Sequence, residues 1–157
     1  MSVLTSSSFP WEAVSAVATC VAALGVGLAF WQIWLTRSIA QLQFEDALAR
    51  EYRELCTSIP ASVFLREPFT DEQYKETFDE FYRYVDMSNE QVSLRQRGRI
   101  SKRVWKNWCS GIEQNLDLPA FTKAWTEIKA KTPSFKELRA LEDSGFKVDP
   151  KCWPREQ

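Results

Sequence analysis

The strongest constraint on this chain is an apolar run that contains no formal charge. Residues 13–35 read AVSAVATCVAALGVGLAFWQIWL. As a helix, this run would extend about 34 Å at 1.5 Å per residue, which is enough to cross a hydrocarbon core of about 30 Å. We therefore expect a transmembrane helix over residues 13–35. The alternative is a buried helix of a soluble bundle.

The residues around the run predict how it sits in a membrane. No Lys or Arg precedes Arg37, so the positively charged start of a secretory signal is missing. Arg37, Arg50 and Arg53 follow the run within about 20 residues, and the positive-inside rule then places the C-terminal part in the cytoplasm. Tryptophans that favour the membrane interface lie near both ends of the run: Trp11, Trp31 and Trp34.

Small and polar residues follow one side of the predicted span. Steps of alternately three and four residues connect Ser15, Ala18, Ala22, Gly25, Ala29, Gln32 and Thr36, which we call the seam. A period of 3.5 residues keeps such a stripe facing a partner helix, and close backbone approach drives helix association in lipid. The amide of Gln32 also favours a partner over lipid. We expect a homo-oligomer, although Ala and Gly are common in membrane helices and the seam can reflect that composition alone.

The rest of the chain is rich in helix signals. Apolar residues continue at helical spacing after the span, so the first helix is expected to run to about Thr57. Pro60 and Pro68 bracket a loop. Thr70, with Gln73 three residues later, forms a capping box that opens the next helix, and Gly98 closes that helix.

Three further helices are expected before the C-terminus. Ser101 is the predicted N-cap of the first, and Asp117 with Pro119 starts the second, which ends near Thr132. Ser134 and Glu137 form a capping box for the third, which stops at Gly145.

The predicted fold class is therefore all-α, with one N-terminal transmembrane helix continuing into a cytoplasmic helical bundle. We expect a short non-cytoplasmic lead over residues 1–12, the span over 13–35, a cytoplasmic helical domain over 36–145 and an extended tail over 146–157. A cytoplasmic portion of this size is large enough for one domain with its own core.

A dense group of cations lies between two predicted helices. The group contains Arg95, Arg97, Arg99, Lys102, Arg103 and Lys106, with no acid among them. It surrounds the predicted helix N-terminus at Ser101, where backbone amides and the helix dipole favour anions. This cluster is a candidate anion-binding site for the phosphate of a nucleotide, RNA or lipid headgroup. The alternative is a solvated helix face whose positive charges balance the acidic stretches EDALAREYRE and DEQYKETFDE.

The residue types of this chain do not favour a catalytic function. The chain contains no histidine, which removes the commonest general base and the usual nucleophile triads. The cysteines, Cys20, Cys56, Cys109 and Cys152, have no metal-like spacing. We therefore expect no catalytic residues, no metal site, no cofactor and no enzymatic activity.

One segment carries a resemblance to known proteins. Residues 81–112 read FYRYVDMSNEQVSLRQRGRISKRVWKNWCSGI. The aromatic pair before Asp86 and the NEQ, GRIS and VWKNW motifs resemble a group of small bacterial membrane proteins with a single span and a helical cytoplasmic domain. This resemblance implies the bacterial inner membrane, with the N-terminus outside.

The layout is also similar to accessory membrane proteins of RNA-targeting CRISPR systems, which assemble into rings and perturb the inner membrane on activation. That family is linked to a nuclease-like fold marked by an Arg followed a few residues later by a His. Because this chain has no histidine, the resemblance implies the architecture and an antiphage-defence context, and not the nuclease role.

Two functional hypotheses follow. In the first, the chain is an oligomeric inner-membrane effector or accessory protein that forms a pore or perturbs the membrane, with a protein or RNA/nucleotide partner from a defence system. In the second, a passive span tethers a helical adaptor that binds a partner protein or an anionic ligand. Both hypotheses require the lipid bilayer as a partner, and only the first requires the seam to bring copies together.

Overall fold

The computed structural model describes residues 11–154, except for the side chains of residues 11–13, 16–18, 20 and 23. The predicted lead therefore lies almost wholly outside the described residues, as do the side chains of Trp11, Ala18 and Cys20. The chain divides into two compact units, Met1–Leu42 and Gln43–Gln157, which are considered separately below.

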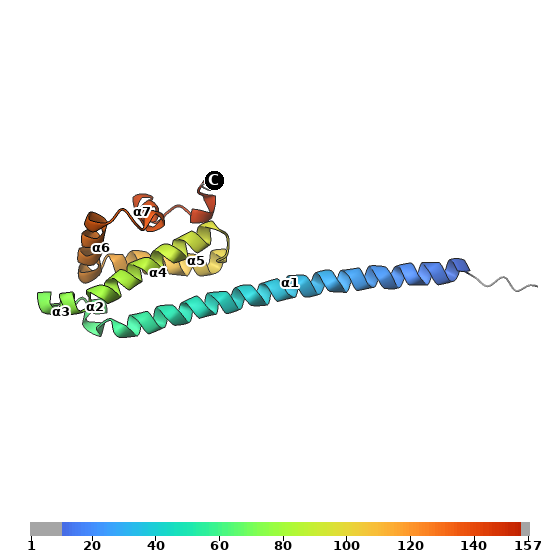
Figure 1. Ribbon diagram of the computed structural model, residues 1–157, viewed down its shortest axis with the longest axis horizontal. Coiled ribbons are helices and arrows are strands. Elements are labelled where there is room, and N and C mark those ends of the chain that lie inside the picture. Colours follow the sequence, from blue (N-terminus) through green and yellow to red (C-terminus); the bar gives the residue numbers. More distant parts are fainter. Residues whose placement is uncertain (1–10, 155–157) are drawn as a thin grey trace, which may run out of the picture. The chain divides into compact units, whose positions relative to one another are not determined.

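Every regular element in the described part of the chain is helical, which confirms the all-α prediction. Figure 1 labels the helices along the chain. They are α1 Trp11–Ser58, α2 Ala61–Phe64, α3 Asp71–Glu76, α4 Phe78–Gln96, α5 Lys102–Leu116, α6 Pro119–Lys131, α7 Lys136–Asp143 and the 3-10 helix η1 Pro150–Cys152.

Helix α1 is a single unbroken element that begins in the first unit and ends in the second (Figure 1). Its end at Ser58 agrees with the prediction of about Thr57. The helix stops there because Ile59 precedes Pro60, and the proline ring disfavours a helical backbone at the residue before it. Within the second unit, α1 buries Leu48 and Leu55, so this part of the helix belongs to the core.

Aromatic rings fill the centre of the second unit. Phe121 of α6 meets Phe81 and Tyr84 of α4 edge-on, at ring-centroid distances of 4.9 and 4.7 Å. Helix α4 also contacts α3, α7 and η1, and α5 packs on α6. Edge-to-face pairs add about 0.5–1.5 kcal/mol each beyond the burial of their area. The other fully buried large side chains include Ile100, Leu138, Leu141, Val85 and Val92.

The segment predicted as one helix between Thr70 and Gly98 is two helices. The capping box of Thr70 and Gln73 is present and confirms the predicted start. The helix then breaks at Thr77, whose φ of −99° and ψ of 2° separate α3 from α4. Gly98 ends α4 as predicted, in the left-handed region at φ 74°. The N–H of Arg99 donates to Leu94 O at 2.9 Å, so the end is a Schellman motif.

The start of α6 lies slightly later than predicted. Ser101 is confirmed as the N-cap of α5, with its side chain accepting a bond from the Val104 N–H at 3.4 Å. Asp117, expected to open α6, is instead the C-cap of α5. Leu118 is the N-cap of α6 and Pro119 occupies its first turn, where the missing N–H costs nothing.

The predicted capping box of α7 is wrong. The N-cap is Phe135, at φ 65°, and it makes no side-chain cap bond. The N–H of Leu138 donates instead to Asn89 Oδ1 of α4 at 3.0 Å. Ser134 contributes its backbone O, which accepts a bond from Arg139 Nε at 2.9 Å. The cap of α7 is therefore supplied by a residue distant in the sequence.

The tail predicted to be extended over residues 146–157 is partly folded. Gly145 ends α7 as predicted, at φ 63°. The chain then forms η1, whose N-cap Asp149 accepts a bond from the Lys151 N–H at 3.0 Å. Pro150 is fully buried and Trp153 packs against the core. The segment up to Trp153 thus belongs to the second unit, because its apolar side chains find partners there.

Two substitutions distinguish the observed cap of α7, at Asn89, from the predicted cap, at Ser134. We expect Asn89→Ala to lower the free energy of unfolding by about 1–2 kcal/mol, because it leaves the Leu138 N–H without its acceptor. Ser134→Ala, the matched control, should change it by less than about 0.5 kcal/mol. Chemical denaturation of the two variants measures both values. A larger loss from Ser134→Ala than from Asn89→Ala would contradict the tertiary cap.

Candidate functional site

The first candidate surface is the part of α1 within the first unit. The exposed large hydrophobic side chains of the described residues lie almost all on this stretch, from Val14 to Leu42. Leu65, Tyr82 and Val148 are the exceptions. Exposure along α1 reaches 73% at Phe30. Contiguous apolar surface of this kind marks a site of contact with another protein or with a membrane.

The large apolar residues lie on most sides of α1 and leave the side of the seam to small and polar residues. Leu24 and Leu28 lie on one side, whereas Val26 and Phe30 lie on the other, because residues two positions apart point about 200° from each other. An amphipathic helix would gather them on the face that meets its partner. A helix that is apolar all round needs an apolar medium, or partners, on all sides.

Over the residues that the structure describes, the length and mean hydropathy of the helices do not indicate a membrane span. Within the set of side chains that the structure describes, no helix combines the length and hydropathy needed for a membrane crossing.

The seam residues lie along the exposed surface of α1. Ser15, Ala22, Gly25, Ala29, Gln32 and Thr36 are exposed, and the side chain of Ala18 lies outside the described set. The hydroxyl of Thr36 donates to Gln32 O at 2.8 Å, so the helix itself satisfies that donor. A Cβ at Gly25 would meet no atom within 4 Å, and the same is true of Gly27. The single chain therefore has room for a side chain at either glycine.

Arg95 does not belong to the predicted anion-binding cluster. Its side chain is 5% exposed and forms an ion pair with Asp149, with Nε 2.8 Å from Oδ1. Its Nη1 donates to Ile100 O at 2.6 Å. The hydrogen bond from Arg95 is the main cause that holds the pKa of the Asp149 carboxyl below its usual range. Arg95 therefore joins η1 to the α4–α5 corner, and its guanidinium is buried within the second unit.

The predicted anion position at the N-terminus of α5 is also taken. The Ser101 N–H donates to Glu45 Oε1 at 2.7 Å, and Glu45 is buried. A carboxylate from α1 thus supplies the negative charge that the helix N-terminus favours. At this amide the carboxylate of Glu45 occupies the place that a phosphate would take, and anion binding by the rest of the cluster stays a prediction. The other five cations of the cluster, Arg97, Arg99, Lys102, Arg103 and Lys106, are exposed.

Sequence reasoning missed both Glu45 and Asp149. Glu45 precedes Leu48 by three residues and so lies on the core-facing stripe of α1, where a charge signals a buried partner. Asp149 stands directly before Pro150, a pattern typical of a helix start. Each residue carried a local signal, but neither signal identifies the partner.

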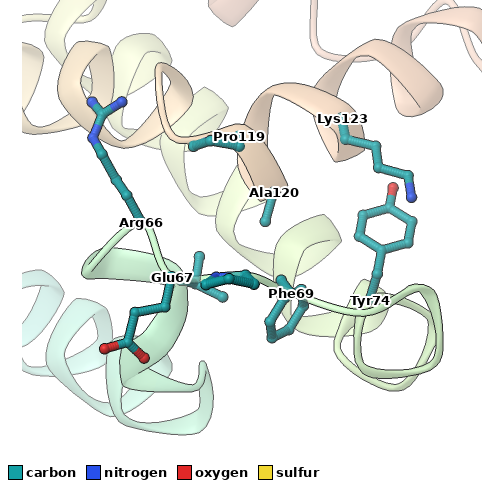
Figure 2. A pocket seen from close by; sticks show the side chains of 9 residues that line it. Arg66, Glu67, Phe69, Tyr74, Pro119, Ala120 and Lys123 are labelled. Carbon is teal, nitrogen blue, oxygen red and sulfur yellow. The ribbon is translucent and has the colours of Figure 1, made fainter.

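A hollow of about 360 Å³ opens in the second unit between the α2–α3 loop and α6 (Figure 2). Arg66 and Lys123 stand at opposite ends of it, with Phe69 and Ala120 between them. Both cations are already paired: Arg66 with Asp117 at 2.9 Å, and Lys123 with Asp71 at 2.7 Å. Lys123 Nζ also lies 4.1 Å from the centroid of the Tyr74 ring. The two cations that border this hollow are therefore paired locally, and the carboxylate of Glu67 also borders it.

The thiols of Cys56 and Cys109 are not activated as nucleophiles. Burial, with smaller contributions from Glu113 and Asp149, raises the pKa of Cys109 to about 11. Burial also raises the pKa of Cys56. A reactive cysteine needs the opposite shift, because the thiolate is the nucleophile. Nor do three or more His, Cys, Asp or Glu side chains come together as a possible metal site among the residues that the structure describes.

Comparisons of the chain with protein-family models, with curated proteins and with solved structures find no match.

The Arg95–Asp149 pair gives a test of the corrected site. We expect Asp149→Ala to lower the free energy of unfolding by about 2–4 kcal/mol, because it leaves the buried Arg95 guanidinium uncompensated. Asp117→Ala breaks the exposed pair with Arg66 and should cost less than about 1 kcal/mol. Denaturation of both variants measures the difference.

The same pair predicts a pH dependence. Because the folded-state pKa of Asp149 is lowered, its contribution is present above the ordinary aspartate pKa and is lost as pH falls through the lowered value. The stability gap between the wild type and Asp149→Ala should therefore shrink in acid. A gap that stays constant down to acid pH would contradict the ion pair.

Proposed function

We propose that this chain is an oligomeric single-pass protein of the bacterial inner membrane, which acts as a membrane-perturbing effector or accessory protein in antiphage defence. In this proposal α1 spans the bilayer with the N-terminus outside, and the second unit lies in the cytoplasm. One observation carries the proposal: between Val21 and Trp34 the large apolar side chains of α1 are exposed on every side of the helix except that of the seam.

The sequence supports lipid as the medium that covers this surface. Residues 13–35 contain no Asp, Glu, Lys or Arg, including the positions whose side chains lie outside the described set. Trp31 and Trp34 lie near the end of that run with their rings exposed, 5.8 Å apart between centroids. Indole rings favour the membrane interface, and Arg37 follows directly on the side proposed to face the cytoplasm.

Self-association is the second part of the proposal. Gln32 presents an exposed amide in an otherwise apolar stretch, and an amide at membrane depth favours a hydrogen-bonding partner. Gly25 lies two helical turns before it, on the seam. A second copy of α1 offers both groups a partner, with close backbone approach at Gly25. The effector role, the inner membrane and the defence context come from the resemblance of residues 81–112 and of the overall layout.

Gly25 and Gly27 form a matched pair for testing the seam. Neither glycine has a neighbouring atom within 4 Å of the position that a Cβ would take, so leucine at either site should leave the single chain folded. We expect Gly25→Leu to shift the full-length protein in detergent toward the monomer, by about tenfold in the dissociation constant or more. Gly27→Leu, which lies off the seam, should leave the oligomer intact. Light scattering during size-exclusion chromatography measures the mass.

Dye leakage from vesicles separates the two functional hypotheses. The effector hypothesis predicts leakage from vesicles that carry the wild type or Gly27→Leu, and less leakage with Gly25→Leu. Equal oligomer size and equal leakage for the two leucine variants would remove the basis for the effector. The passive adaptor would then be the better interpretation.

The proposed orientation can be tested with a native cysteine. Cys152 is exposed in the second unit, whereas Cys56 and Cys109 are partly buried. A membrane-impermeant maleimide should therefore label Cys152 in inverted inner-membrane vesicles and leave it unlabelled in intact spheroplasts. Cys152→Ser identifies the signal, and a Ser7→Cys variant in that background should show the opposite pattern. Labelling of Cys152 from outside intact spheroplasts would contradict the orientation.

A further inference from the structure

One region of the second unit gathers cations from two segments of the chain, the α4–α5 corner and the stretch after α7. The five exposed residues Arg97, Arg99, Lys102, Arg103 and Lys106 form its main part, at the corner between α4 and α5. Lys147 borders the same hollow of about 310 Å³ as Lys102 and Lys106. Lys151 lies beside the corner, with its Cε 3.7 Å from the position that a Cβ on Gly98 would take. We call these five residues, with Lys147 and Lys151, the basic face.

The fold leaves the basic face with little internal compensation. None of its members forms an ion pair with another residue in the described part of the chain. Two acids lie nearby: Asp149 binds Arg95 and also attracts Lys102, and the buried Glu45 accepts the Ser101 N–H. Glu113 is the exposed acid that borders the hollow with Lys147. Positive charge therefore dominates this side of the corner.

The buried ion pair explains why Lys147 and Lys151 join the corner. Asp149 lies between them in the sequence and is bound by Arg95, which also holds Ile100 O at the start of α5. This arrangement fixes the segment after α7 against the α4–α5 corner. The buried Arg95 therefore positions Lys147 and Lys151, two lysines of the basic face.

We propose that the basic face binds the anionic headgroups of the bilayer that α1 occupies. The inference rests on the proposed function for the source of the lipid. Val148 is an exposed apolar residue directly after Lys147, which suits contact with a headgroup layer. The negative surface of an anionic leaflet attracts lysines and arginines that come within a Debye length of it.

Nucleic acid fits the face less well. Single-stranded RNA binding combines cations with aromatic rings on which bases stack. The two tryptophans of α5 are not available for stacking, because Trp105 is 4% exposed and Trp108 is partly buried against the core. The face therefore offers charge with an apolar contact and lacks exposed rings.

Amine labelling of the reconstituted full-length protein tests the proposal. The protein is placed in nanodiscs of phosphatidylcholine alone and of an equal mixture of phosphatidylcholine and phosphatidylglycerol, and labelled with a water-soluble acylating reagent. We expect labelling of Lys106, Lys147 and Lys151 to fall by about fivefold or more in the anionic discs. Lys123, which lies on α6, serves as the internal reference and should not change. High salt should restore the labelling, because it screens exposed charges.

A triple variant and a matched control sharpen this test. Arg99→Gln, Lys102→Gln and Arg103→Gln together leave the three reporter lysines in place and should abolish the difference between the two discs. Each cation near an anionic surface strengthens attachment about fivefold, so the three together account for on the order of 100-fold. Arg53→Gln, Lys75→Gln and Arg83→Gln together remove the same charge from exposed positions elsewhere and should behave as wild type.

The outcomes distinguish the two proposals. If the chain enters neither kind of disc, the proposed function fails. If it enters both and the reporter lysines are labelled equally, the membrane proposal stands and the lipid-binding face is overturned. Protection of the reporters in neutral discs by added single-stranded RNA, with none from anionic lipid, would assign the face to nucleic acid instead.

Discussion

The apolar surface of α1 is the constraint on which the rest of this account depends. Its large side chains between Val21 and Trp34 are 54–73% exposed in the single chain, and they occur on every side of the helix except that of the seam. Each Å² of such surface left in water costs about 25 cal/mol, so a helix of this composition must be covered. A groove in one partner would cover one side only. In the proposed function, lipid covers the helix and copies of the helix replace lipid along the seam.

The second unit shows how far local sequence signals reach. The caps at Thr70, Ser101 and Gly98 were predicted correctly because the residues that form each one lie within a single turn or two of chain. The all-α class and the end of α1 followed from helical spacing and from Pro60. These features depend on backbone geometry and on neighbouring side chains, which the sequence displays directly.

The predictions that failed depended on partners distant in the chain. Ser134 and Glu137 match a capping box, but Asn89 of α4 supplies the bond that α7 uses. Arg95 belongs to a run of cations in the sequence, and the fold removes it from that run by burying it against Asp149. Periodicity and spacing show that a residue is charged or apolar. They do not show which segment will lie opposite, and that contact decides whether a charge serves the core or the surface.

Together these features suggest a division of roles. In the proposed function, α1 supplies the attachment to lipid and the contact between copies. The second unit carries an aromatic core and a basic face, two of whose lysines lie in the segment that Arg95 holds. Alkaline carbonate extraction of membranes from cells that make the full-length chain tests the central claim most directly. The account predicts that the protein stays in the membrane pellet until detergent is added. Recovery of the intact chain as a monomer in the detergent-free aqueous fraction would contradict it.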